Sequence, residues 1–177
     1  KGNWNLTNQQ FGSVSITKQA DATAIITNGG DYSEVSVKVK DYTPSKNEDG
    51  SLKKGNFSAQ VYFIFDNGKQ FQVRIHNSDE DGNYKIQTMG DTNSFTKWKW
   101  RKDLTTAQKT ALLDGDGVTF TVKIVGTNAE MYIDGTKMAT VALEENGVSY
   151  DGSLAQVKLL FNGSVGVQNI EMPYTLK

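Results

Sequence analysis

The stretch Phe57-Ser-Ala-Gln-Val-Tyr-Phe-Ile-Phe-Asp-Asn-Gly-Lys-Gln-Phe-Gln-Val-Arg-Ile75 decides the fold class of this chain. After the pair Asn67-Gly68, apolar residues occupy every second position, and a period of two places them on one face of a strand. Before that pair, the run is apolar on both faces from Val61 onward, as in a central strand that is covered on both sides. Asn-Gly between two such runs is typical of a two-residue hairpin turn with positive φ. The stretch therefore predicts a β-hairpin.

The same alternation recurs around residues 35–39, 118–124 and 157–161. The pairs Asp134-Gly135 and Asn162-Gly163 have the composition of two further hairpin turns. Short, regularly spaced strands in a chain with two prolines indicate a sandwich or a barrel. We therefore predict an all-β chain that folds as one antiparallel β-sandwich domain over residues 1–177.

Residues 104–113 break this alternation. Thr105 and Gln108 have the spacing of a capping box, in which each side chain satisfies a backbone N–H at the start of a helix. The pair Asp114-Gly115 ends the run. The apolar residues of this segment recur every three to four positions and are Leu104, Ala107, Ala111 and Leu112. We predict one short helix here that packs on an edge of the sandwich.

The charge balance excludes several classes of partner. The 177 residues include 19 basic and 20 acidic side chains, for a net charge of −1, so no long-range field attracts a phosphate backbone. We therefore expect no nucleic-acid partner. No apolar run approaches the ~20 residues of a membrane-spanning helix, so we expect no membrane insertion. The absence of cysteine excludes disulfides, thiolate zinc sites and thiol nucleophiles.

Motifs for catalysis are missing or incomplete. The chain has one histidine, His76, and no G-x-S-x-G motif, so neither a Ser-His-Asp site nor a set of several zinc ligands is present. Glycoside hydrolysis needs two carboxylates that face one bond, often as Glu-x-Asp-x-Glu on one strand of a sandwich. That run does not occur, and neither Glu80-Asp81 nor Glu144-Glu145 shares a strand face. We predict no catalytic residues and expect that the chain is not an enzyme; the alternative is a hydrolase whose carboxylates come from distant strands.

One segment matches the first half of a calcium-binding loop. In Asn77-x-Asp79-x-Asp81-Gly82, alternating oxygen ligands precede a glycine that permits a sharp bend. The twelfth position is Thr88 rather than the bidentate glutamate of such loops. We expect a plain acidic turn and no cofactor, with Asp79 and Asp81 as the calcium candidates if a structural calcium is bound.

Two tryptophans two positions apart give the first candidate binding surface. In Trp98-Lys99-Trp100-Arg101, an extended backbone would place both indoles on one face, about 7 Å apart. This distance is close to the spacing of successive sugar rings, whose C–H faces stack on aromatic planes. We predict that Trp98 and Trp100 form a sugar-stacking strip. The alternative is that one indole anchors the segment in the core while the other is exposed.

Polar residues around the first hairpin give a second set of binding candidates. Gln72, Arg74 and His76 alternate with Val73 and Ile75, so they point away from the main core. Amide, guanidinium and imidazole groups exchange hydrogen bonds with hydroxyls. The predicted carbohydrate-binding residues that join the two tryptophans are Gln72, Arg74, His76, Tyr62, Tyr84 and Gln87. The alternative is an ordinary solvated sheet face.

Two strings resemble a known superfamily. Glu130-Met-Tyr-Ile-Asp-Gly-Thr-Lys-Met-Ala139, preceded by Gly117-Val-Thr-Phe-Thr-Val-Lys-Ile-Val125, resembles the strand and hairpin of concanavalin A-like and laminin-G-like jelly rolls. The first hairpin, from Tyr62 onward, resembles the central hairpin of lectin-like modules in bacterial polysaccharide-degrading or surface-attached proteins. The resemblance implies a jelly roll of the concanavalin A-like lectin type, with two curved sheets. It also implies glycan binding on a concave face, often with a structural calcium, outside a bacterial cell.

Together these features predict a non-catalytic carbohydrate-binding module that recognises a polysaccharide or oligosaccharide, such as the glucan starch, by stacking and hydrogen bonds. The alternatives are a protein-interaction or adhesion module of the laminin-G type and, third, a glycoside hydrolase. We expect a monomer. Because the chain begins with Lys1 rather than Met, we expect that it was excised from a longer polypeptide or stripped of a signal. We also expect it to be part of a larger multidomain protein, extracellular or on a bacterial cell surface.

Overall fold

The computed structural model describes residues 2–5, 11–16, 22–26, 32–44, 46–51, 57–77, 84–90, 100–113, 116–144, 153–163 and 167–177. Thirteen strands and one helix lie in these ranges. They are β1 (Gly2–Asn5), β2 (Phe11–Ile16), β3 (Ala22–Ile26), β4 (Glu34–Pro44), β5 (Phe57–Phe65), β6 (Gln70–Asn77), β7 (Tyr84–Met89), β8 (Trp100–Asp103), α1 (Thr106–Leu113), β9 (Val118–Val125), β10 (Asn128–Ile133), β11 (Thr136–Ala142), β12 (Leu154–Gly163) and β13 (Val167–Leu176).

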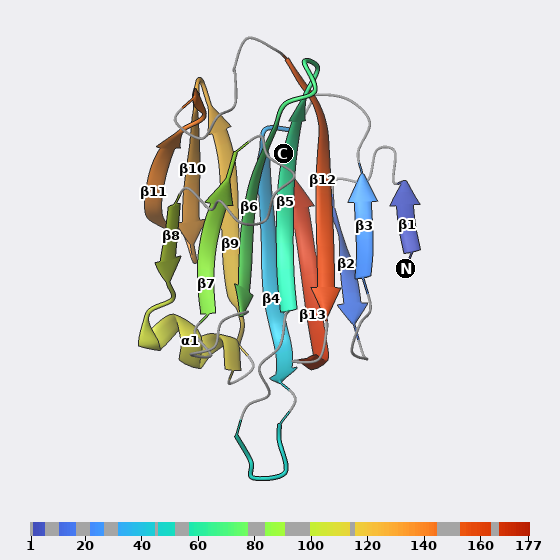
Figure 1. The fold of residues 1–177 in the computed structure, drawn as a ribbon, viewed down its shortest axis with the longest axis vertical. Helices are drawn as coiled ribbons and strands as arrows, with labels where there is room; N and C mark the ends of the chain where they lie inside the picture. The colour runs from blue at the N-terminus through green and yellow to red at the C-terminus, as the bar shows by residue number, and fades with distance from the viewer. Residues whose placement is uncertain are drawn as a thin grey trace.

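The strands form two sheets, one lying behind the other in Figure 1. Sheet A has seven strands in the order β1-β3-β12-β5-β6-β7-β8, and sheet B has six in the order β11-β10-β9-β4-β13-β2. Each pairing between the described strands is antiparallel except that of β1 with β3, which is parallel. The predicted β-sandwich is therefore confirmed, with one parallel pair at the edge of sheet A.

The hydrophobic core fills the space between the two sheets. Alternate residues of β4, β5, β6, β9, β10 and β12 project inward, as the period of two predicts. Val61 and Phe63 from β5 meet Val37 of β4 and Phe120 of β9 in one cluster, and all four are fully buried. Burying such a side chain stabilises the fold by about 1.5–3 kcal/mol. The residues that alternate with the inward ones along each of these strands form the outer faces of the sheets.

The first hairpin joins β5 to β6 through Asp66, Asn67 and Gly68. Phe65 N–H donates to Lys69 O at 2.9 Å, and Gly68 N–H donates to Phe65 O at 3.0 Å. Of the Asn-Gly pair, Gly68 alone has positive φ, at 80°. The hairpin is confirmed, but its turn has three residues that end on a left-handed glycine, instead of the predicted two-residue turn.

The predicted hairpin at Asp134-Gly135 joins β10 to β11. Both residues have positive φ, 47° and 76°, as a two-residue type I′ turn requires. Ile133 and Thr136 pair directly on either side of the turn. This hairpin is confirmed in the predicted form.

The predicted hairpin at Asn162-Gly163 is wrong. β12 continues through both residues, which pair with the first residues of β5. The next strand, β13, lies in the other sheet, so β12 and β13 do not form a hairpin. β12 pairs here with β5, a strand about a hundred positions away in the chain, and this pairing extends β12 through the Asn-Gly pair. Local composition does not encode so distant a partner.

The predicted helix is confirmed as α1. Thr105 N–H donates to Gln108 Oε1 at 2.9 Å, and Gln108 N–H donates to Thr105 Oγ1 at 3.2 Å, so both halves of the capping box form. Leu112 is fully buried in the core, and α1 contacts β4 and β9 at the lower end of the sandwich in Figure 1. With eight residues, this one helix of the described ranges is too short to span a bilayer.

Candidate functional site

The outer face of sheet A is the candidate functional site. Side chains from neighbouring strands lie side by side where the strand register pairs them. The pairings of β12, β5, β6, β7 and β8 arrange the outer side chains in three rows that cross the strands. The first row is Lys158, Tyr62, Gln72 and Met89; the second is Gln60, Arg74, Gln87 and Arg101; the third is Ser58, His76, Lys85 and Asp103.

Hydrogen bonds link the three rows along β5. Tyr62 O–H donates to Gln60 Oε1 at 2.8 Å, and Gln60 Nε2 donates to Ser58 Oγ at 2.9 Å. All three side chains are buried. In a chain of buried hydrogen bonds each group orients the next, so donors and acceptors are held in place. This part of the face is therefore a preorganised polar array.

Arg74 of β6 is oriented by Gln87 of β7. Nε and Nη2 of Arg74 both donate to Gln87 Oε1, at 3.3 and 3.2 Å. Gln87 is buried and Arg74 is half-buried, because the register places them opposite each other on the outer face. The contact fixes the plane of the guanidinium, whose fork of N–H donors matches carboxylate and hydroxyl oxygens.

The ring of Tyr62 lies in the first row. Lys158 Nζ is 5.0 Å from the ring centroid, within the range of a cation–π contact. Burial raises the pKa of the Tyr62 hydroxyl above its ordinary value of 10.0, and the positive charge of Arg74 opposes this shift. The phenol is therefore neutral at physiological pH and keeps the proton that it shares with Gln60.

Gln72 carries a buried acceptor without a donor. Its side chain is 2% exposed, and Oε1 has no hydrogen-bond partner in the structure. A buried unsatisfied acceptor costs about 1–3 kcal/mol, so a hydroxyl or water that donates here recovers that free energy. The register places Gln72 between Tyr62 and Met89. Gln72 Oε1 can therefore accept a hydrogen bond from a donor outside the protein, such as a water or a hydroxyl.

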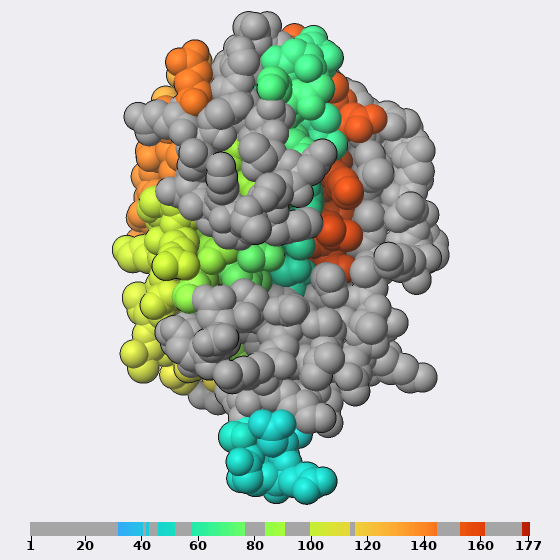
Figure 2. Space-filling view, viewed as in Figure 1, coloured from blue at the N-terminus to red at the C-terminus, as the bar shows by residue number. Residues whose placement is uncertain are grey.

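Part of this face reaches the surface. Arg74 and Lys158 are half-buried, and Arg101 and Asp103 of the edge strand β8 are exposed. Figure 2 shows green atoms of residues 57–77 and 84–90 at the surface in a band across the middle of the molecule. The buried polar side chains lie beside these four groups in the same rows. A ligand that meets the accessible cations therefore also approaches the preorganised array.

Carboxylates and metal ligands are sparse here. Asp103 is the one carboxylate in the described strands of sheet A, so these strands supply at most one of the two groups that glycoside hydrolysis uses. Among the residues described, no three His, Cys, Asp or Glu side chains lie close enough to hold a metal ion. The calcium candidates Asp79 and Asp81 lie outside the described residues.

The structure brings five of the eight predicted binding residues to this one face: Tyr62, Gln72, Arg74, His76 and Gln87. His76 is fully buried between Ser58 and Lys85 in the third row. The period of two explains this grouping, because outer positions of paired antiparallel strands meet on one side. A role of these residues in binding carbohydrate stays a prediction.

Tyr84 and Trp100 lie on the inner side of sheet A. Tyr84 is buried in the core, where its ring packs edge-on against Tyr42 with centroids 5.9 Å apart. Trp100 pairs with Thr88, an inward residue of β7, and packs partly buried against the core. The expectation that these two rings share the outer face is wrong, because the register of β7 and β8 turns their side chains inward. Trp98 lies outside the described residues, so a joint role of the two tryptophans stays a prediction.

Sequence reasoning missed six polar residues of the site, namely Ser58, Gln60, Lys85, Arg101, Asp103 and Lys158. A signal for four of them was present. Ser58 and Gln60 have the same alternation along β5 as Tyr62, and Lys158 alternates with the buried residues of β12. Lys85 alternates with Tyr84 and Ile86 along β7, although every residue of that strand is buried.

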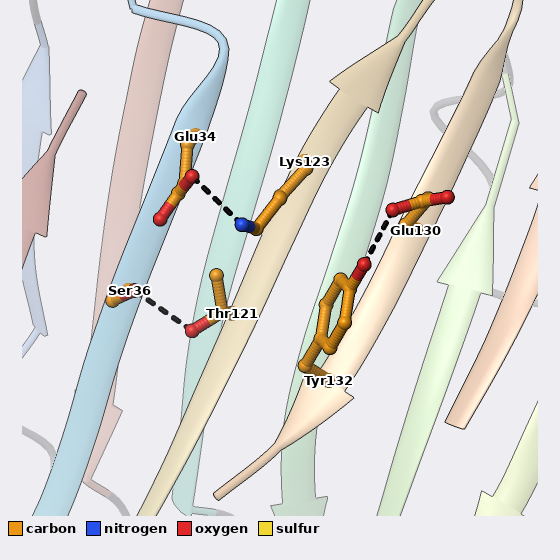
Figure 3. Close-up of polar contacts among 6 residues, drawn as sticks. All are labelled: Glu34, Ser36, Thr121, Lys123, Glu130 and Tyr132. Atoms are coloured by element: carbon orange, nitrogen blue, oxygen red, sulfur yellow. Dashed lines mark hydrogen bonds and ion pairs between the residues drawn. The ribbon is translucent and has the colours of Figure 1, made fainter. Parts of the chain in front are cut away.

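The outer face of sheet B provides a contrast (Figure 3). Lys123 Nζ lies 3.1 Å from Glu34 Oε2 across β9 and β4, and the hydroxyls of Ser36 and Thr121 are hydrogen-bonded at 2.7 Å. The hydrogen bond and charge of Glu34 raise the pKa of the Lys123 ammonium above its ordinary value of 10.5. These groups satisfy one another across the strands.

Tyr132 and Glu130 of β10 continue this polar surface (Figure 3). Tyr132 O–H donates to Glu130 Oε2 at 2.5 Å, and Lys137 Nζ of β11 pairs with Glu130 Oε1. The hydrogen bond from Lys137, followed by that from Tyr132, holds the pKa of the Glu130 carboxyl below its ordinary value of 4.5. Lys123 Nζ lies 5.3 Å from the Tyr132 ring centroid. Lys123 and Lys137 of this face are thus matched with the carboxylates of Glu34 and Glu130.

No protein-family model and no curated protein sequence matches this chain. Solved structures match its fold. The laminarinase catalytic domain of Thermotoga maritima MSB8 is 11% identical, with a TM-score of 0.58 over 98% of this chain and 82% of that one. The Crh5 transglycosylase is 13% identical, with a TM-score of 0.57 over 93% and 71%. The legume lectin-like domain of Entamoeba histolytica is 14% identical, with a TM-score of 0.55 over 95% and 84%.

These matches confirm the concanavalin A-like jelly roll as the fold. They also correct the expectation that the chain is not an enzyme. A laminarinase catalytic domain and a transglycosylase share this fold with a lectin-like domain, so the fold belongs to enzymes as much as to binding modules. The missing Glu-x-Asp-x-Glu run was one basis of that expectation, and its absence removes one arrangement of carboxylates only.

Proposed function

We propose that the protein recognises a polysaccharide or oligosaccharide on the outer face of sheet A. The observation that carries this proposal is the orphaned acceptor Gln72 Oε1 within a hydrogen-bonded polar array. Sugars offer many hydroxyl groups and bind best where donors and acceptors are already fixed, because less ordering is needed on binding. Fixed amides and a guanidinium beside one tyrosine ring supply both kinds of group.

The fold supports this proposal. Proteins with the same jelly roll include a laminarinase domain, a transglycosylase and a lectin-like domain, all with names that refer to carbohydrate chemistry or lectins. We place the activity outside the cell or at a bacterial cell surface, where polysaccharides are met. Fractionation of the native host, with an antibody against this chain, tests that location.

The test of recognition is affinity electrophoresis in gels that contain one polysaccharide at a time, with starch, β-glucan and acidic polymers in the panel. Retention of the wild-type chain by at least one polymer supports the proposal. Gln72→Met should weaken that retention because the replacement has no oxygen acceptor. Ser36→Ala, on the outer face of sheet B, is the control and should leave retention unchanged. Equal retention of the Gln72→Met variant and the wild type would remove this face as the site.

The second candidate function is cleavage or transfer of a glycosidic bond, which the laminarinase and transglycosylase matches favour. Asp103 is the acidic group that the described strands of sheet A offer for it. Incubation with fluorescently labelled oligosaccharides, followed by separation of the products, tests this function. If the wild type forms products and Asp103→Asn does not, catalysis belongs to this face. If both form products, catalysis lies elsewhere.

A further inference from the structure

We propose that Met138 is a site of oxidation, at which a peroxide converts the thioether to a sulfoxide whose oxygen accepts a hydrogen bond from Gln108. The juxtaposition that carries this inference is a half-buried sulfur atom of β11 beside a side-chain amide that also caps α1. The site belongs to sheet B and is independent of the proposed saccharide recognition on sheet A.

A β-bulge contains Met138. In the pairing of β10 with β11, Met131 is opposite Ala139. The next residue of β10, Tyr132, is opposite Lys137, so Met138 has no residue opposite it. A bulge of this kind bends the strand and changes the direction of a side chain. β11 is also the outermost described strand of sheet B, at the left of Figure 1, so the bulge lies at an edge of the sandwich.

Met138 is the most accessible of the methionines with a described side chain. It is half-buried and packs against the hydrophobic core. Met89 and Met131 are 1% and 0% exposed. The side chain of Met172 in β13 lies outside the described residues. Because oxidation requires that the oxidant reach the sulfur, a peroxide should modify Met138 before Met89 and Met131.

The sulfur of Met138 lies beside the amide that caps α1. Gln108 Nε2 donates to Met138 Sδ at 4.0 Å, and Gln108 Oε1 accepts from Thr105 N–H at 2.9 Å. The second bond is half of the capping box, so it holds the amide in one orientation. An N–H donor is therefore already directed at the sulfur before any oxidation.

A sulfoxide oxygen suits this donor better than the thioether does. A thioether sulfur is a weak acceptor, and its separation of 4.0 Å from Gln108 Nε2 is long. An ordinary N–H···O bond has about 2.7–3.2 Å between nitrogen and oxygen. The flexible torsions of methionine allow an oxygen on Sδ to approach Nε2 to that distance. Oxidation of Met138 thus replaces a weak contact with a regular hydrogen bond, and the new polar group is satisfied.

The oxidation needs a peroxide, of which hydrogen peroxide is the simplest. A lone pair of Met138 Sδ attacks one peroxide oxygen, so that an S–O bond forms and the O–O bond breaks. The sulfur loses two electrons, and the second oxygen leaves with both hydrogens as water. The product is methionine sulfoxide, the first step of thioether oxidation.

Peptide mapping by mass spectrometry tests the site. The folded chain is treated with increasing concentrations of hydrogen peroxide, quenched and digested. We expect Met138 to gain one oxygen at least about tenfold faster than Met89 and Met131, because a buried sulfur reacts only when its surroundings open. In the fully denatured chain the three rates should become similar. Equal rates in the folded chain, or no reaction of Met138, would overturn the site.

A matched variant tests the hydrogen bond to the sulfoxide. Gln108→Glu keeps an acceptor for Thr105 N–H, because glutamate also serves in a capping box, but it removes the donor to Met138. The quantity compared is the change in melting temperature on oxidation. It should be about 2–4 °C more negative in Gln108→Glu than in the wild type, the shift expected for one lost hydrogen bond in a chain of this size. The same change in both would show that the oxygen does not bind Gln108.

Met138→Leu is the control for oxidation elsewhere in the chain. Leucine is of similar size and has no sulfur, so position 138 no longer reacts. When the wild type and Gln108→Glu both carry Met138→Leu, peroxide should change their melting temperatures equally. A difference that persists in this background would come from another residue and would overturn the proposed contact.

Discussion

Gln87 Oε1 accepts two hydrogen bonds from Arg74, at 3.3 Å from Nε and 3.2 Å from Nη2, across the pairing of β6 with β7. The amide is buried and the guanidinium is half-buried, so a fixed residue holds a charged one where the outer face of sheet A meets solvent. A guanidinium held in this way has lost its freedom before binding, which lowers the entropic cost of contact with a ligand. The proposed recognition of saccharides depends on this arrangement.

Gln87→Leu removes the acceptor that orients Arg74 and keeps a side chain of similar size. We expect affinity for the retained polysaccharide to fall several-fold, because Arg74 must then be ordered during binding. Isothermal titration calorimetry measures the change, with a less favourable entropy as its signature. Lys102→Gln serves as the control. Unchanged affinity in Gln87→Leu would show that the fixed orientation of Arg74 has no part in binding.

Gln72→Met should raise the free energy of unfolding of the unliganded protein by about 1–3 kcal/mol, because it removes a buried acceptor that has no donor. The same variant should bind saccharide more weakly. Gln60→Met is the matched comparison and should lower stability by a similar amount, since it leaves Tyr62 O–H and Ser58 Oγ without their partner. Urea denaturation measures both. A loss of stability in Gln72→Met would show that Oε1 is satisfied in the folded protein.

Gly117→Ala should severely destabilise the fold. Gly117 has φ of 81°, and a Cβ added there would lie 2.4 Å from the carbonyl oxygen of Val39, which is backbone and cannot rotate away. Gly50 is the matched control, because its φ is 82° but nothing lies within 4 Å of the added Cβ. Gly50→Ala should cost only the left-handed backbone strain, about 1–2 kcal/mol. Similar melting temperatures for the two variants would contradict the close approach of Gly117 to β4.

The ion pair of Glu130 with Lys137 should make a small acid-dependent contribution to stability. Because the hydrogen bond from Lys137 lowers the pKa of Glu130 in the folded protein, the contribution is present above the ordinary pKa of 4.5 and is lost as pH falls through the lowered value. Both side chains are in contact with solvent, so the effect should shrink in high salt. Urea denaturation of the wild type and Glu130→Gln across this pH range measures it. A stability difference that stays constant with pH would contradict the assignment.

Local sequence pattern predicts much of the outer face of sheet A. The alternation of Gln72, Arg74 and His76 with buried residues gives the correct side of β6, because a strand of period two sorts its residues without help from other strands. The capping box of Thr105 and Gln108 gives the start of α1 for the same reason, since both partners lie within one turn.

Trp100 shows where local pattern ends. Tyr84 does not, because Tyr84 and Ile86 alternate with Lys85 and Gln87, which places Tyr84 on the inner face of β7 although every residue of this strand is buried. The side on which Trp100 lies depends on the register of β8 against β7, and a shift of one residue would turn it outward. Strand order is likewise long-range: the pairing of β12 with β5 extends β12 through Asn162, where composition predicts a turn. Local sequence pattern does not give the function either, because enzymes and lectins share this jelly roll.

The most direct test of saccharide recognition by sheet A is an NMR titration of the 15N-labelled protein with oligosaccharides of the polymer that retains it. We expect amide shifts to change in β5, β6 and β7, centred on Gln72, Arg74 and Gln87, and those of Lys123 and Glu130 on sheet B to stay unchanged. Shift changes centred on β9 and β10, with β6 unaffected, would contradict it.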